Sequence, residues 1–282
     1  MTLIRHELKQ SWKSLAIWTA AIGAFIVTCL LIWPEMKGQM QGISSLFSSM
    51  GAFTAAFGMD TLDFGTLNGF YGIECGNILG IGGALFAALA GINALAKEEK
   101  DGTAELLLTH PMSRAKIVTD KLIAVLLQII ALNVVVYLLA VGSMAVIGEA
   151  VPWKTVSLLH LAYFLLQIEI ACICFGISAF LWKGGMGIGL GLAIALYFLN
   201  IIANLSDKAK VLKYITPFGY AESSDIINNG GIAGDKLLIG LALALAESGS
   251  RTGSTAKRIS GNSVLLRQER ATRSFLFFDG VV

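Results

Sequence analysis

Long apolar runs, separated by short polar segments, dominate the pattern along this chain. They predict membrane spans at about residues 15–33, 70–96, 122–147, 156–181, 185–204 and 236–246. A helix needs about 20 residues to cross the hydrocarbon core of a bilayer, so five runs are long enough and the sixth is about half that length. The pattern therefore predicts an all-α, polytopic membrane protein with six transmembrane helices.

Two amphipathic stretches are expected to lie on the membrane surface. The apolar face of the first stretch consists of Ile4, Leu8, Trp12 and Leu15. Its basic residues Arg5, Lys9 and Lys13 lie on another face, which predicts an N-terminal interfacial helix. A second apolar face recurs over residues 36–50. That helix is expected to rest on the bilayer, to pack on its neighbours, or to close the outer mouth of a pathway.

The positions of lysine and arginine orient the predicted spans. Basic residues cluster before the first span and between residues 97 and 121. Because such clusters mark cytosolic segments, we expect the N-terminus and residues 97–121 to lie in the cytosol. Lysines 208, 210, 213 and 236 on the other side weaken the rule without reversing it. The predicted location is the cytoplasmic membrane.

Composition narrows the class of protein further. Hydrophobic residues make up 55% of the chain and charged residues 14%, whereas a soluble domain carries about 25% charged residues. The four cysteines lie in apolar runs and the three histidines are scattered, so we expect no metal site and no cofactor. A nucleic-acid partner is not expected either. The phosphate-loop motif G-x-x-x-x-G-K-[ST] is absent, so nucleotide binding by this chain is not expected.

Small residues recur every fourth position in two of the spans. In the second span the ridge consists of Gly72, Gly76, Gly80, Ala84 and Ala88, and in the fifth span of Gly187, Gly191 and Ala195. Such ridges let helix backbones approach closely in lipid. Either packing within the chain or an interface with a second subunit explains them.

The segment between the second and third spans has strong local signals. Asp101-Gly102 is expected to break the second span, and Thr103 to cap a new short helix of about two turns. Pro111 would stop that helix, and Ser113 would cap the next one. The result is a short helix with exposed leucines, which need a partner to bury them.

This segment resembles the cytosolic loop of ABC-2 type permeases, the membrane subunits of ATP-driven exporters. The resemblance implies that residues 103–109 form a coupling helix that docks on a separate cytosolic ABC ATPase, and that the ATPase binds ATP and Mg²⁺. The implied coupling residues are Glu98, Glu99, Gly102, Thr103, Glu105, Leu106, Leu107, Leu108, Pro111 and Arg114. It also implies a second permease copy, as a homo- or heterodimer, and export across the membrane. The chain itself would not be an enzyme. A non-transporting subunit or regulator of an ATPase complex, and an intramembrane enzyme, are the alternatives.

Two acidic residues fall inside predicted spans. Glu169 lies near the middle of the fourth span and Glu74 near the outer end of the second. A charge there costs about 3 kcal/mol on insertion scales, so each is a candidate for a pathway or a subunit interface. A protonated, hydrogen-bonded structural role is the alternative for Glu169.

The domain prediction is a single transmembrane domain over residues 1–246 with an apparently truncated last helix. Residues 247–282 read as an atypical polar and basic tail. Disorder or a frameshifted end would account for that tail.

Overall fold

The structure, a computed structural model, describes residues 2–59, 61–100, 113–181, 185–240 and 242. The predicted tail at 247–282 and residues 241 and 243–246 of the predicted sixth span lie outside these residues, whereas residues 236–240 and 242 of that span are described and helical.

Helices account for nearly all of the described chain. The α-helices are α1 (Thr2–Ser49), α2 (Ala52–Ala56), α3 (Leu67–Phe70), α4 (Gly76–Lys100), α6 (Arg114–Val146), α7 (Trp153–Ser178), α8 (Met186–Leu205) and α9 (Ser223–Asn229). A π-helix, η1 (Tyr71–Cys75), joins α3 to α4, and two 3₁₀ helices, η2 (Asp207–Tyr214) and η3 (Pro217–Gly219), follow α8.

Five of these stretches are long and apolar enough to cross a membrane. They are Leu3–Gln39, Leu67–Lys97, Ala115–Val146, Trp153–Ser178 and Met186–Leu205. They coincide with the first five predicted spans, although the helices begin or end several residues outside them. The all-helical, polytopic prediction is confirmed, whereas the described residues do not confirm a sixth span.

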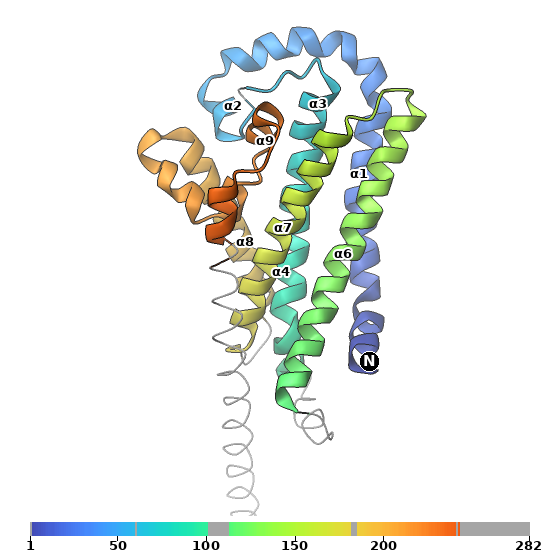
Figure 1. The fold of residues 1–282 in the computed structure, drawn as a ribbon, viewed down its shortest axis with the longest axis vertical. Helices are drawn as coiled ribbons and strands as arrows, with labels where there is room; N and C mark the ends of the chain where they lie inside the picture. Colours follow the sequence, from blue (N-terminus) through green and yellow to red (C-terminus); the bar gives the residue numbers. More distant parts are fainter. Residues whose placement is uncertain (1, 60, 101–112, 182–184, 241, 243–282) are drawn as a thin grey trace, which may run out of the picture.

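The five long helices form a bundle in which the chain alternates in direction (Figure 1). The N-terminus, the end of α4 and the start of α6 lie at one end, which we call the amino-terminal end. The helices α2, α3 and α9 and the α6–α7 connection lie at the opposite end. The first helix turns across this opposite end, with Pro34 inside it, where a missing N–H allows a bend.

A separate N-terminal interfacial helix is not confirmed. The helix α1 is continuous from Thr2, and the side that it buries carries Leu3 and Glu7 rather than the predicted apolar face, of which Trp12 is exposed. The second amphipathic stretch, predicted at 36–50, is likewise the continuation of α1 to Ser49.

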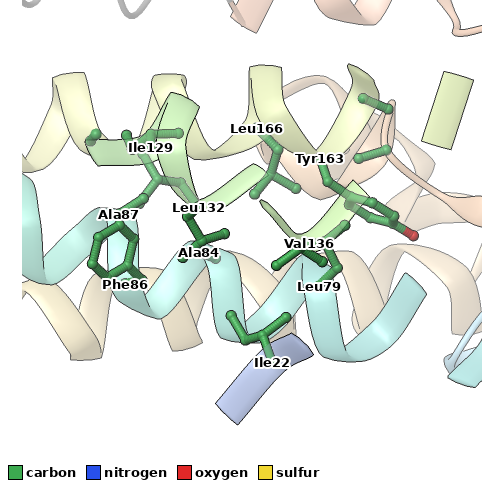
Figure 2. Packing of buried hydrophobic residues seen from close by; sticks show 14 of the residues in the cluster. Ile22, Leu79, Ala84, Phe86, Ala87, Ile129, Leu132, Val136, Tyr163 and Leu166 are labelled. Carbon is green, nitrogen blue, oxygen red and sulfur yellow. The ribbon is translucent and has the colours of Figure 1, made fainter. Parts of the chain in front are cut away.

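The core of the bundle is built on α4, which packs against α7, α6 and α1 (Figure 2). In Figure 2, α4 contributes Leu79, Ala84, Phe86 and Ala87, α6 contributes Ile129, Leu132 and Val136, α7 contributes Tyr163 and Leu166, and α1 contributes Ile22. Since lipid is as apolar as leucine, close van der Waals packing is what holds such helices together.

The small-residue ridge of the second span lies inside this core. A Cβ atom added to Gly76 would approach the hydroxyl oxygen of Tyr163 to 2.6 Å, and one on Gly80 would approach Tyr163 Cε1 to 3.1 Å. Ala84 and Ala88 are buried as well. This ridge therefore packs within the chain.

Candidate functional site

The predicted coupling segment itself lies outside the described residues. This applies to Gly102, Thr103, Glu105, Leu106, Leu107, Leu108 and Pro111. Glu98 and Glu99 belong to the last turn of α4, and Arg114 is the first residue of α6.

Both flanks of the segment are defined, because α4 ends at Lys100 and α6 begins at Arg114. The predicted cap is confirmed: the backbone N–H of Lys116 donates to Ser113 Oγ at 3.3 Å. The chain therefore leaves one membrane-long helix and enters the next at the amino-terminal end of the bundle.

A buried ion cluster ties these two flanking helices to α1. The carboxylate of Glu7 accepts a hydrogen bond from Lys121 on α6 at 2.7 Å and another from Lys97 on α4. Glu7 is 6% exposed and Lys121 1% exposed. Lys97 also donates to Gln10 Oε1 at 2.8 Å. A buried carboxylate is tolerated only with such partners, so the cluster fixes the relative positions of three helices.

A cavity of about 330 Å³ lies beside this cluster. It is bounded by α1, α4 and α6, with Met186 of α8 at its edge. Glu7, Lys97 and Lys121 form its charged part, and its apolar wall includes Phe86 and Leu89.

Two hydrogen bonds between polar side chains join elements deeper in the bundle. Asn133 of α6 donates to Gln167 of α7 at 2.6 Å. The hydroxyl of Tyr71 and His160 Nε2 lie 2.7 Å apart and are hydrogen-bonded. Each contact gives a buried polar side chain a partner that lipid cannot supply.

The two acids predicted inside spans have different surroundings. Glu169 is 1% exposed and accepts a hydrogen bond from the hydroxyl of Tyr220 at 3.0 Å. Gly240 packs against the same carboxyl, since a Cβ there would lie 2.5 Å from Glu169 Oε2. Glu74 is only partly buried and lies in the π-helix η1 at the opposite end of the bundle. The structure does not bring the two acids into one site.

A second ion cluster, which we call the Glu222 hub, lies at the opposite end of the bundle. The carboxylate of Glu222 accepts from Asn204 of α8 at 2.7 Å and from Lys213 of η2 at 2.6 Å. Gly58, with φ +64°, packs against the same carboxylate, where a side chain would be strained and would overlap it. The hub joins the segments that cap the bundle at this end.

Comparison with known families settles the general class. A model of the ABC-2 family transporter protein matches residues 1–243. This chain belongs to the ABC-2 family. Membership makes it a multi-pass membrane component of an ABC transporter, a type of subunit that works with an ABC ATPase. A search of curated proteins and a search of solved structures each returned no match.

The sequence pattern of this ABC-2 protein does not predict the Glu7 cluster or the Glu222 hub. The positive charges of Lys97 and Lys121 indicate only a cytosolic location, although Glu7 is the one acid among the basic residues of the N-terminal stretch. That isolated acid is the signal that points to a buried pairing. Glu222 has no comparable signal, because its partners Lys213 and Asn204 lie on other elements, 9 and 18 residues away, beyond the reach of a helical pattern.

Proposed function

We propose that this chain is the permease subunit of an ATP-driven exporter in the cytoplasmic membrane, with its amino-terminal end in the cytosol. The observation that carries the proposal is the family match over residues 1–243. The position of the predicted coupling segment supports it, because α4 and α6 meet that segment at the same end of the bundle as the N-terminus.

In this proposal the partner ATPase binds ATP and Mg²⁺ and docks on residues 103–109. Closure of the ATPase pushes this short helix, and α4 and α6 carry the displacement into the bundle. The Glu7 cluster transmits it to α1, because one carboxylate contacts both flanking helices. Glu98, Glu99 and Arg114 flank the docking surface.

A second permease copy completes the transporter. The outward side of α8 supports this interface, because Gly187, Gly191 and Ala195 are exposed. An added Cβ on either glycine would meet no described atom within 4 Å. Small residues on an uncovered face suit close approach of another helix in lipid.

The two span acids take separate roles. Glu169 is a neutral, hydrogen-bonded structural acid, since it is buried against Tyr220 and Gly240. Glu74, partly exposed in a π-helical turn, belongs to the outer part of the pathway, since π-turns often mark functional positions.

Replacing Leu107 with Asp tests the coupling role. An unpaired carboxylate in the interface costs several kcal/mol, and 1.4 kcal/mol is already a tenfold loss of affinity. We expect the variant to reach the membrane normally but to lose both the co-purifying ATPase and transport. Leu106→Asp and Leu108→Asp point about 100° to either side and identify the docking face. If all three variants keep the ATPase and full transport, the segment is not the contact.

A cysteine at Thr103 tests the orientation, in a background without the four native cysteines. We expect a membrane-impermeant thiol reagent to label it in inside-out vesicles and not in intact cells. Labelling of intact cells would place the segment outside and remove the basis for coupling.

A further inference from the structure

The wall of the cavity at the amino-terminal end of the bundle is charged at one end and apolar at the other. Its volume of about 330 Å³ lies at the lower end of the range of about 300–1,000 Å³ that is usual for small-molecule sites. Glu7, Lys97 and Lys121 lie toward the end of the bundle, whereas Phe86 lies about three turns deeper along α4 than Lys97. A molecule that fills this space therefore meets charge at one end and apolar side chains at the other.

The charged end has hydrogen-bonding capacity left for a ligand. The ammonium group of Lys97 has three donors, and Glu7 and Gln10 occupy two of them. Asn93 lies one turn away on the same face of α4 and lines the cavity. Its amide makes no hydrogen bond within the described part of the chain. A third donor on a lysine favours an anionic acceptor, because charge-assisted hydrogen bonds are the stronger ones.

We propose that this cavity binds a single-chain amphiphile whose anionic headgroup contacts Lys97 and Asn93. The chain lies along Phe86 and Leu89 of α4 and Val125 of α6. The volume accommodates one short chain and not a two-chain phospholipid. The interpretation of this cavity as a site for transported cargo rests on the proposed permease function. Binding of the amphiphile itself does not depend on the ATPase.

Brominated dodecanoate, with bromine on the terminal carbon, is a suitable probe. Bromine quenches indole fluorescence at contact range, and Trp18 packs against Phe86 at the deep end, with ring centroids 6.3 Å apart. We expect saturable quenching of the permease purified in a neutral detergent. That component should disappear in Trp18→Phe, which separates it from quenching of tryptophans at the lipid surface.

Two variants test the two proposed headgroup contacts on α4. Lys97→Gln removes the charge, and Asn93→Leu fills the space while keeping the Glu7 cluster. Each should raise the probe concentration needed for half-maximal quenching about tenfold. Lys116→Gln is the matched control, because Lys116 lies at the same end of the bundle, bonds Asp120 at 3.2 Å and does not line the cavity. It should leave the quenching unchanged.

Several outcomes would overturn the proposal. Quenching that never saturates, or that both cavity variants leave intact, would show that the cavity does not take the probe. If Lys97→Gln fails to fold, Asn93→Leu decides alone. Equal saturable quenching by brominated dodecyl maltoside would contradict an anionic headgroup, and equal quenching by brominated phosphatidylglycerol would contradict a single chain. Loss of ATPase binding in Leu107→Asp is measured separately, so failure here leaves the permease function standing.

Discussion

Two helices of this protein carry similar ridges of small residues, and they use them in opposite ways. On α4 the ridge faces the core, where Tyr163 of α7 packs directly on Gly76 and Gly80. On α8 the ridge at Gly187 and Gly191 is exposed. The helix α8 instead packs on α4 through a different glycine, Gly189, on which a Cβ would lie 2.9 Å from Ile92 Cγ2.

The comparison shows that small residues at this spacing indicate a face that another element can approach closely. The spacing does not indicate whether that element belongs to the same chain or to a second subunit. In both helices the spacing of four residues identifies one face, because such positions lie on the same side of a helix. The glycines of α4 make room for an aromatic side chain of the same chain. The exposed glycines of α8 have no such neighbour among the described residues, which leaves room for a second subunit.

The largest effect is expected from Gly80→Leu. An added Cβ would already lie 3.1 Å from Tyr163 Cε1, so the larger side chain of leucine would displace the Tyr163 ring. Overpacking of this kind costs about 3 kcal/mol, a large fraction of the stability of a typical protein. We expect little folded protein in detergent, measured by thermal unfolding and size-exclusion chromatography.

The matched control is the same substitution on the outward ridge, Gly191→Leu. Its folded chain should be as stable as the parent, because no described atom lies near the new side chain and helix propensity favours leucine over glycine by about 1 kcal/mol. Equal destabilisation by the two substitutions would remove the difference between the ridges.

A smaller and more specific effect is expected from Gly191→Leu on assembly. A bulky side chain would separate two α8 helices that meet at this ridge, so association of two permease copies should weaken at least tenfold, with transport lost in parallel. Gly191→Ala should keep most of the association. Light scattering of the purified transporter measures the mass. If Gly191→Leu forms a dimer as readily as the wild type does, α8 is not the interface.

Much of the fold was predictable from the pattern, because lipid imposes a simple length and polarity rule. The first five spans and the Ser113 cap follow from local signals and are confirmed. The predicted interfacial helix is not confirmed, because α1 is continuous from Thr2 and buries Leu3 and Glu7 on one side. The decisive interaction of that stretch is between Glu7 and Lys121, which are 114 residues apart along the chain.

The candidate site was less predictable for the same reason. The coupling segment has turn and capping residues close together in sequence, so its boundaries at α4 and α6 could be anticipated. The cavity depends on three helices that meet at one end of the bundle, and no local pattern contains that information. The Glu222 hub likewise joins α8, η2 and the segment before α9 through side chains whose pairing depends on the fold.

The smallest effect should come from Glu169→Gln. This substitution tests whether Glu169 of α7 stabilises the fold without taking part in transport. A glutamine oxygen can still accept the hydrogen bond of Tyr220, so we expect a change of less than about 1 kcal/mol and near-normal transport. Glu169→Leu removes the acceptor and leaves a buried hydroxyl unpaired, which should cost about 1–3 kcal/mol. Thermal unfolding and transport, measured on the same preparations, separate the two roles. If Glu169→Gln abolishes transport at normal stability, the charge belongs to the transport pathway, and the structural role proposed for Glu169 is wrong.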